Sequence, residues 1–207
     1  MADGDPAYRY QDASLNHSHR FLLPALARIL DEARPARVFE VGCGNGAVAN
    51  WMASRGIDVA GVDFSESGIA QARVAYPSLR LAMGSAYDDL AGVYGQFPAV
   101  VSLEVVEHLY FPRKFAKTVF DLLEPGGAAI ISTPYHGYLK NLALALTGRM
   151  DAHFTALWDG GHIKFWSERT LRHLLGEAGF TKIRFRRVGR IGPLARSMIA
   201  VAERPPA

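Results

Sequence analysis

From residue 38 to residue 133 the pattern of apolar and polar residues changes repeatedly between a strand pattern and a helix pattern. Short apolar runs of strand length stand at 38–41, 58–63, 79–84, 98–103 and 128–133. Apolar residues at helical spacing lie between several of these runs and predict helices at 47–55, 65–76 and 111–123. Apolar strands that are separated by helices predict a parallel sheet that is covered on both faces.

The two ends of the chain depart from this pattern. After a helix that is predicted at 168–178, strands at 182–188 and 197–202 follow with only a short turn region between them. No helix fits into that turn region, so we expect these two strands to pair antiparallel. Ahead of the sheet, apolar residues at helix-like spacing predict an amphipathic helix over 14–33. We expect one domain over residues 1–207, with no interdomain linker.

Composition narrows the class of protein only a little. The chain has 207 residues, of which 49% are apolar and 21% are charged, and its net charge of +3 is modest. These values are typical of a globular domain with one generous core. Cys43 is the only cysteine, so no internal disulfide can form and a reducing compartment is expected. No secretory signal pattern or run of transmembrane length is visible, and we therefore expect a cytoplasmic protein.

Three glycines alternate directly after the first predicted strand: Gly42, Gly44 and Gly46. Glycine is favoured where the backbone needs a positive φ or must approach a ligand closely. Gly42, Gly44 and Ala47 also fit the dinucleotide fingerprint, and Asp63 lies where a ribose-binding acid is expected, so an NAD-binding oxidoreductase is one hypothesis. The leading helix, the lack of a separate substrate domain and the antiparallel end of the sheet favour a different nucleotide-like cofactor.

Three motifs, of which the glycine turn is the first, follow one another along the chain. They are Glu-x-Gly-x-Gly-x-Gly at 40–46, Gly-Val-Asp-Phe-Ser at 61–65 and Leu-Glu-Val-Val-Glu-His-Leu at 103–109. From about Ser14 to its end, the chain thereby resembles the class I S-adenosylmethionine-dependent methyltransferases. Shorter motifs at 107–109, 122–127 and 132–134 make it similar to the small-molecule branch that includes the ubiquinone-biosynthesis O-methyltransferases.

The resemblance implies both a fold and a cofactor. The fold would be a doubly wound, Rossmann-like α/β domain whose seven-stranded, mostly parallel sheet has the order 3-2-1-4-5-7-6 and an antiparallel last strand. The cofactor would be S-adenosyl-L-methionine, and the enzyme a methyltransferase. Residues 1–35 are expected to form an N-terminal lid region. Residues 134–166 are too long for a plain connection and are expected to form an insertion that covers the substrate.

The resemblance also implies contacts to the parts of the cofactor. Glu40 would position its ammonium group, because a charged group that leaves water needs such a partner. Asp63 would accept hydrogen bonds from both ribose hydroxyls, and Phe64 would lie against the adenine. Ser85 stands where the family often has an aspartate, so it would accept a weaker bond from the adenine amino group, and the Ala86 backbone would donate to the ring.

Further contacts come from the chain's beginning and from the end of the fourth strand. Main-chain oxygens at Leu103 and Glu104 would face the cofactor ammonium, while Tyr8 and Tyr10 would close over the cofactor. Arg20 resembles a residue that meets the methionine carboxylate, and the alternative is a solvent-facing helix charge. The predicted cofactor site comprises Tyr8, Arg20, Glu40, Gly42, Cys43, Gly44, Gly46, Asp63, Phe64, Ser85, Ala86, Leu103, Glu104 and His108.

Methyl transfer from a sulfonium is an in-line displacement, so it needs a positioned acceptor and, for some acceptors, a general base. His108 is the first candidate for the base because it follows the fourth strand at the ligand-binding rim; the alternative is that it only orients the next loop. The candidate catalytic residues are His108, Tyr135, His136, His153 and His162. A metal site built from Asp151, His153, Asp159 and His162 is disfavoured by irregular spacing, and none is predicted.

The acceptor is expected to be a small molecule, most simply a phenolic or quinol-like oxygen compound. The insertion carries six large aromatic residues and, together with the leading helix, is the expected place of substrate selection. Its apolar stretch 138–150 is expected to pack in the core, and the alternatives are contact with an apolar acceptor and a weak membrane-surface contact. The basic strand region 182–196 allows a nucleic-acid substrate, but the Asn/Asp-Pro-Pro-Tyr motif is absent after the fourth strand, so no nucleic-acid partner is expected.

Other hypotheses about the function stay open. An N-methyltransferase for a small heterocycle or amine would have the same fold. The alternatives from other classes are a nucleic-acid methyltransferase, an NAD-binding oxidoreductase and a non-catalytic binder, although the intact glycines and Asp63 argue against the last. The chain is expected to act as a monomer or homodimer.

Overall fold

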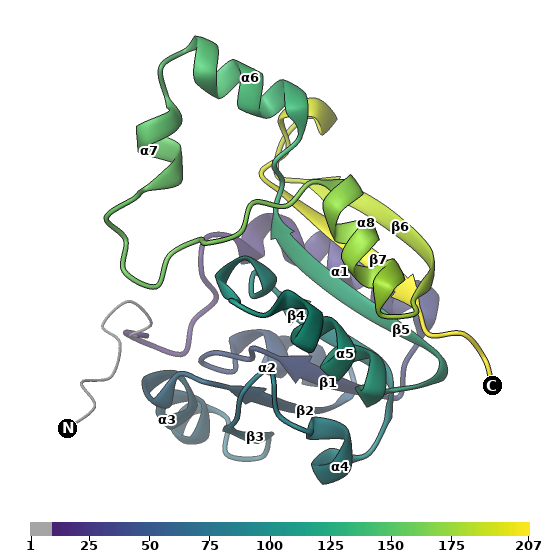
Figure 1. The fold of residues 1–207 in the computed structure, drawn as a ribbon. Coiled ribbons are helices and arrows are strands. Elements are labelled where there is room, and N and C mark those ends of the chain that lie inside the picture. The colour runs from purple at the N-terminus through teal and green to yellow at the C-terminus, as the bar shows by residue number, and fades with distance from the viewer. Residues whose placement is uncertain (1–9) are drawn as a thin grey trace.

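Seven strands form one sheet in the order β3-β2-β1-β4-β5-β7-β6 in the computed structural model, which describes residues 10–207 (Figure 1). The strands are β1 (Arg37–Val41), β2 (Asp58–Asp63), β3 (Arg80–Met83), β4 (Phe97–Leu103), β5 (Leu123–Pro134), β6 (Thr181–Val188) and β7 (Ser197–Glu203). The first five run parallel, and β7 is antiparallel to both of its neighbours. The predicted α/β class, strand order and antiparallel end are confirmed.

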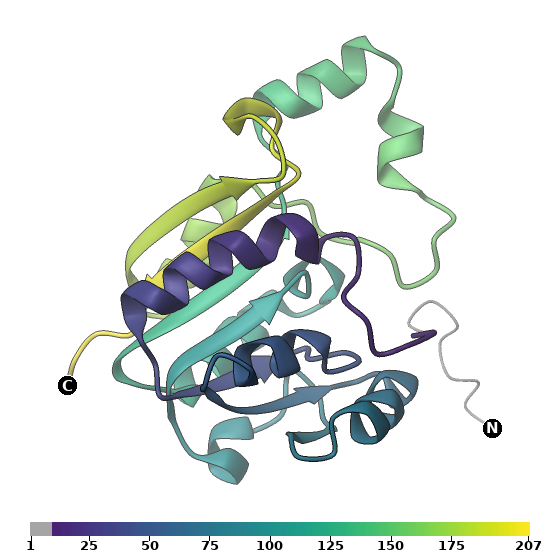
Figure 2. The same cartoon turned by 180° about the vertical axis from the view of Figure 1, so that it is seen from behind.

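Helices cover both faces of the sheet (Figures 1 and 2). On one face lie α1 (His19–Ala33), α2 (Ala47–Ala53) and α3 (Glu66–Ala75); on the other lie α4 (Leu90–Tyr94), α5 (Pro112–Leu122) and α8 (Glu168–Glu177). Successive strand residues point to opposite faces, so Val38 packs in the core below α1 and α2, while Phe39 packs in the core below α5. This double burial explains why the strands read as continuous apolar runs.

The leading helix is shorter than its apolar spacing predicted. It begins at His19 rather than near residue 14, because the Asn16 side chain accepts hydrogen bonds from the backbone N–H groups of Ser18 and His19 at 3.0 and 3.2 Å. Residues 10–18, which we call the strap, instead run across the start of α2. There the Asn45 side-chain amide donates to the carbonyl oxygens of Asp12 and Ser14 at 2.8 and 3.0 Å.

The chain leaves the sheet after β5 and returns to it at Trp166, whose backbone pairs with Tyr135 in an isolated bridge. We call residues 135–166 the arm. It contains α6 (Tyr138–Leu146) and α7 (Met150–Phe154), and it projects beyond the edge of the sheet where β4 and β5 end (Figure 1). No residue of α6 or α7 is buried, which contradicts core packing for this apolar stretch.

Candidate active site

A cleft of about 1690 Å³ lies at the carboxyl ends of the parallel strands. This is the edge at which open α/β sheets bind ligands. The strap, the loops after β1 to β4 and the arm all contribute to its walls. The predicted site residues that line it are Glu40, Gly42, Cys43, Gly44, Asp63, Phe64, Ser85, Ala86, Leu103, Glu104, His108 and His162.

The turn after β1 needs glycine for both backbone conformation and space. The φ angles are +82° at Gly42, +52° at Gly44 and +77° at Gly46, a region that residues with a Cβ rarely adopt. A Cβ at Gly42 would collide with the Val105 side chain, and one at Gly44 with the Tyr10 hydroxyl. The N–H groups of Gly42 and Cys43 both donate to the carbonyl oxygen of Val62, which fixes the turn against β2. Bare backbone is therefore presented to the cleft.

Two carboxyl groups face this turn. Asp63, at the end of β2, accepts hydrogen bonds from the N–H groups of Gly44 and Ser65, each at 2.7 Å. Burial raises the pKa of Asp63, while these two bonds oppose the rise. Glu40 is only 2% exposed, and burial, followed by the charge of Asp63, raises its pKa to about 8. One oxygen of Glu40 has no hydrogen-bond partner, so a cationic ligand group fits beside it.

The predicted adenine contacts lie at the ends of β2 and β3. Phe64 leaves its ring 80% exposed at the cleft, where a flat ligand could stack on it. The Ser85 hydroxyl accepts a hydrogen bond from the N–H of Tyr87 at 3.1 Å, and the Ser85 N–H donates to Asp88 at 2.7 Å. The Ser85 hydroxyl oxygen retains acceptor capacity, so the proposed weak contact to an adenine amino group is compatible with the geometry.

Several predicted residues lie elsewhere. Tyr8 is outside the described residues. Arg20 is exposed on α1 and is not among the residues that line the cleft, whereas its neighbour His19 is. Gly46 is the N-cap of α2 and does not line the cleft, and a Cβ at this position would meet the Leu81 side chain. The proposed cofactor contact of Arg20 therefore stays a prediction that the geometry does not favour.

Three of the five catalytic candidates do not line the cleft. His136 is 7% exposed and packs in a ring cluster within the arm, 5.8 Å from Phe154 and 5.3 Å from His153 between ring centroids. Burial lowers the pKa of His136 to about 4. Tyr135 is also buried, with the Arg187 guanidinium 4.7 Å above its ring. Tyr135 therefore packs in the core of the domain, whereas His136 and His153 pack within the arm, and the geometry favours a catalytic role for none of the three.

The strap places Tyr10 against the glycine turn. Its ring contacts Gly44 and Gly68, its N–H donates to the Ser67 hydroxyl at 3.4 Å, and its carbonyl oxygen accepts a bond from Gln71. Burial, followed by the charges of Asp63, Cys43 and Glu40, raises the pKa of the Tyr10 hydroxyl. The strap thus covers the part of the cleft that the resemblance assigns to the cofactor.

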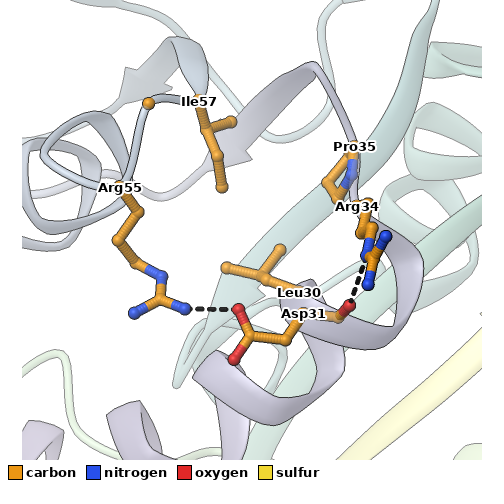
Figure 3. A pocket seen from close by; sticks show the side chains of 7 residues that line it. Leu30, Asp31, Arg34, Pro35, Arg55 and Ile57 are labelled. Carbon is orange, nitrogen blue, oxygen red and sulfur yellow. Dashed lines mark hydrogen bonds and ion pairs between the residues drawn. The ribbon is translucent and has the colours of Figure 1, made fainter.

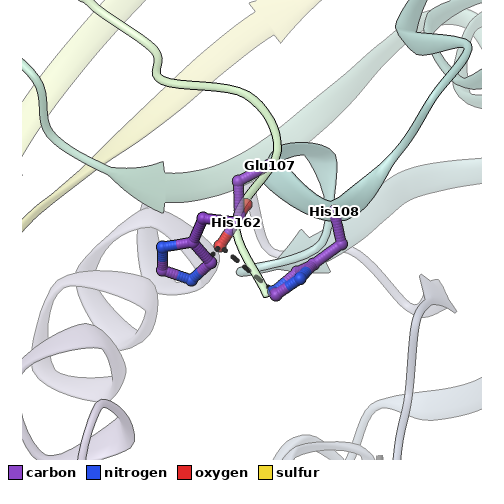
Figure 4. A group of neighbouring side chains, drawn as sticks. All are labelled: Glu107, His108 and His162. Carbon is purple, nitrogen blue, oxygen red and sulfur yellow. Dashed lines mark ion pairs between the residues drawn. The ribbon is translucent and has the colours of Figure 1, made fainter. Parts of the chain in front are cut away.

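At the other end of the cleft, three polar side chains converge (Figure 4). Glu107 and His108 come from the 3-10 turn η2 (Val106–His108) after β4, and His162 comes from the arm. Glu107 Oε1 lies 4.0 Å from Nε2 of both His108 and His162, and the two imidazole centroids are 4.9 Å apart. Among the described residues these three can share an ion, which the set Asp151, His153, Asp159 and His162 considered from sequence does not.

The charge balance of this group is unusual. Glu107 is 1% exposed, and burial, followed by the neighbouring Glu104 carboxyl, raises its pKa well above the usual range. The Thr133 hydroxyl favours the charged form of Glu107, but no contact of either carboxylate oxygen has normal hydrogen-bond geometry. Burial lowers the pKa of His108 and lowers that of His162 to about 4, so both imidazoles are neutral at pH 7.

Sequence reasoning named His108 and His162 but did not assign Glu107 a role. The available signal was an acidic residue in an apolar stretch directly before His108. Apolar and aromatic residues surround this end of the cleft: Leu109, Tyr110, Phe154, Trp158 and Ile163. The Trp158 ring lies 5.9 Å from the His108 ring and 5.3 Å from the His162 ring.

A second, smaller hollow of about 410 Å³ lies between the end of α1 and the loop after α2 (Figure 3). Arg55 and Arg34 both bond to Asp31, through its carboxylate at 2.5 Å and its carbonyl oxygen at 3.4 Å. Both arginine side chains of this hollow thus have hydrogen-bond partners within the chain, and we assign the hollow no function.

A sheet of this order, with a glycine turn after β1, an acid at the end of β2 and a cleft at the carboxyl edge, defines a Rossmann-like methyltransferase. The chain belongs to the methyltransferase domain family, whose model matches residues 14–184. It is an S-adenosylmethionine-dependent enzyme. Glu40, the positive-φ glycines and Asp63 fit this cofactor, because they offer an acid for its ammonium group, open backbone and a diol acceptor.

Curated relatives share much of the chain. The ubiquinone biosynthesis O-methyltransferase of Ruegeria pomeroyi is 30% identical over 188 residues, which cover 86% of this chain and 74% of the relative. The protein of the same name from Caulobacter sp. (strain K31) is 37% identical over 126 residues, covering 59% of this chain and 48% of the relative. A solved S-adenosylmethionine-dependent methyltransferase from Mesorhizobium loti has a TM-score of 0.68 at 21% identity, over 87% of this chain and 96% of its own; this likeness shows the fold.

Within residues 10–207, no helix is both long and apolar enough to cross a membrane.

Proposed function

We propose that the enzyme methylates an oxygen of a small phenolic or quinol-like acceptor. The observation that carries this proposal is the composition of the cleft's far end. There two neutral imidazoles, His108 and His162, stand beside Trp158 and other apolar side chains. A flat aromatic acceptor fits such walls, and its hydroxyl can point to the polar group. The name of the relative from Ruegeria pomeroyi points to the same chemistry.

When bound, S-adenosylmethionine supplies an activated methyl group, which the acceptor oxygen takes in line as the carbon–sulfur bond breaks and S-adenosylhomocysteine leaves. The residues of the chain hold both molecules. Glu40 and Asp63, which line one end of the cleft, would hold the ammonium and ribose groups there, and the strap would cover them. The arm and the η2 turn hold the acceptor at the other end. In-line transfer requires that water be excluded and that the reacting atoms be aligned, and the strap and the arm are the segments that would do this.

A phenolic hydroxyl must lose its proton for this reaction, either before or during methyl transfer. The group around Glu107 is a polar feature of the acceptor end, and its two imidazoles, neutral at pH 7, are the candidate acceptors of this proton. A neutral azole nitrogen already carries a nucleophilic lone pair and needs no such group, whereas an ammonium acceptor, like a phenol, must first lose a proton. The group therefore favours a phenolic acceptor over an azole.

The test is a screen of purified protein with S-adenosylmethionine against matched phenols, quinols, azoles and amines. Release of S-adenosylhomocysteine is measured, and mass spectrometry of the product identifies the methylated atom. We expect aryl methyl ethers from the phenols or quinols. Methylation of the azoles or amines without the phenols would replace this proposal by N-methylation. The Asp63→Ala variant is the negative control, since it keeps the acceptor end intact.

A further inference from the structure

The spacing within Glu107, His108 and His162, which we call the rim triad, does not match direct hydrogen bonding. Oε1 of Glu107 is 4.0 Å from each histidine Nε2, beyond the usual range of about 2.7–3.2 Å for such bonds. Two metal–ligand bonds of about 2.1 Å span at most about 4.2 Å. The separation between the carboxylate and each imidazole is therefore one that a coordinated ion can bridge with small side-chain rotations.

The orientation of His108 is the one a metal ligand needs. Its Nδ1 lies 3.0 Å from the carbonyl oxygen of Gly160 and 3.2 Å from that of Gly161. A carbonyl oxygen can only accept, so Nδ1 carries the hydrogen and the lone pair is at Nε2, the atom nearest Glu107. Metal-binding histidines commonly donate their other ring N–H to a backbone carbonyl in this way, which fixes the tautomer and the ring orientation.

The charges around the triad also favour a cation. Glu107 is almost completely buried, and neither of its oxygens has a hydrogen-bond partner of normal geometry. Its neighbour Glu104 is fully occupied, because its two oxygens accept bonds from the hydroxyls of Ser132 at 2.7 Å and Ser197 at 3.1 Å. Two buried carboxyl groups thus lie close together, and only that of Glu104 has hydrogen-bond partners of normal geometry. A bound cation would compensate the other.

We propose that the rim triad binds one divalent first-row transition ion, of the class of Mn²⁺, Co²⁺ and Zn²⁺. Two imidazoles and one carboxylate suit these ions better than Mg²⁺ or Ca²⁺, which prefer oxygen ligands. Three protein ligands leave coordination positions open, as in catalytic zinc sites. His108 and His162 line the cleft while Glu107 lies behind them, so the open positions face the acceptor.

This inference rests on the proposed function for its chemical role. An acceptor hydroxyl that coordinates the ion gives its proton to solvent and binds as the oxyanion, because a bound cation stabilises the negative charge. The ion keeps its oxidation state throughout. Nε2 of His108 then acts as a ligand and not as the base predicted from sequence. The ion also joins the arm, through His162, to the η2 turn.

Binding can be measured without catalysis. Untagged protein is treated with a chelator and titrated with Co²⁺, whose visible absorption reports coordination, while tryptophan fluorescence reports quenching near Trp158. We expect one Co²⁺ per chain, and at least tenfold weaker binding in His162→Ala and in Glu107→Gln. His173→Ala is the matched control, because His173 is exposed on α8 and pairs with Glu177, and it should bind like the wild type.

Two results would overturn the assignment. Equal Co²⁺ affinity in the wild type and in His162→Ala would show that the rim triad is not the binding site. Tighter binding of Mg²⁺ than of Co²⁺ would show that the proposed class of ion is wrong. The His162 side chain is 29% exposed in the arm, so its replacement should leave the circular dichroism spectrum and melting temperature unchanged even if Glu107→Gln does not fold.

The proposed function can fail separately. Tight Co²⁺ binding by the triad without methylation of any phenol or quinol would retain the metal site and contradict the acceptor class. Undiminished phenol methylation by chelator-treated protein that binds no Co²⁺ would retain the acceptor class and contradict the metal site.

Discussion

Replacing Glu40 with glutamine should change the pH dependence of stability in the cofactor-free enzyme. The usual pKa of a glutamate is 4.5, and burial and then Asp63 raise that of Glu40 to about 8. Folded protein therefore keeps Glu40 protonated between these values, while the unfolded chain releases the proton. Because the unfolded state binds fewer protons in this window, stability falls as the pH rises from 4.5 to 8, and the loss is complete above 8.

The size of this effect follows from the two pKa values. Taken at about 1.4 kcal/mol per pH unit, their difference gives at most about 5 kcal/mol, and we expect about 2–5 kcal/mol. Glutamine does not titrate, although its buried amide carries a pH-independent cost of about 1–3 kcal/mol. The free energy of unfolding of Glu40→Gln, taken relative to that of the wild type, should therefore rise by about 2–5 kcal/mol between pH 5 and pH 9.

Urea unfolding followed by circular dichroism at several pH values measures this difference directly. Glu32→Gln is a suitable control, because Glu32 is exposed and pairs with Arg186 at the surface. Parallel pH profiles for the wild type and Glu40→Gln would refute the reasoning, since they would show that Glu40 titrates alike in the folded and unfolded states.

The same residue links cofactor binding to pH. An ammonium group beside Glu40 favours the ionised carboxylate, so binding at pH 7 should release a proton, and affinity should rise toward pH 8. Calorimetry in buffers of different ionisation enthalpy detects that proton. In Glu40→Gln we expect no such proton release and an affinity about 10–150-fold lower, as for the loss of one charged hydrogen bond.

Three further predictions concern other parts of the cleft. Asp63→Ala should weaken S-adenosylmethionine binding at least tenfold in calorimetry without loss of fold, and unchanged affinity would contradict the ribose assignment. Tyr10→Ala should open the strap and raise the dissociation rate of S-adenosylhomocysteine in stopped-flow experiments, whereas an unchanged rate would show that the strap does not cover the cofactor. We also propose that the arm touches a membrane surface, because Leu139 and Leu146 are 56% and 79% exposed. Changing both residues to serine should reduce the fraction of protein that sediments with anionic vesicles. Equal sedimentation of variant and wild type would contradict this contact.

Much of the fold could be predicted because its signals are local. The inner strands β1, β2, β4, β5 and β7 are largely buried, so each contains a short apolar run, whereas the edge strand β6 has no buried residue. The Ser65 hydroxyl caps α3 by accepting a hydrogen bond from the Gly68 N–H, as its position suggests. The helix α4 could not be predicted in this way. It has five residues and buries only Leu90, which is too little to form a helical period. The early start predicted for α1 failed because the Asn16 side chain starts the helix later.

That the proposed cofactor residues would lie together could be predicted for a similar reason, since they stand within or directly after strands whose ends share one edge. The acceptor half depends on contacts between distant segments. His162 reaches Glu107 only because the arm folds back over the η2 turn, where the backbone N–H groups of Ile163 and Lys164 both donate to the carbonyl oxygen of Glu107 at 2.9 Å. No periodicity encodes such a pairing. The same backbone bonds hold His162 close to the carboxylate before any ligand binds, so ion binding needs only side-chain rotation. A substitution that loosens this return of the arm should therefore weaken the metal site and the acceptor site together.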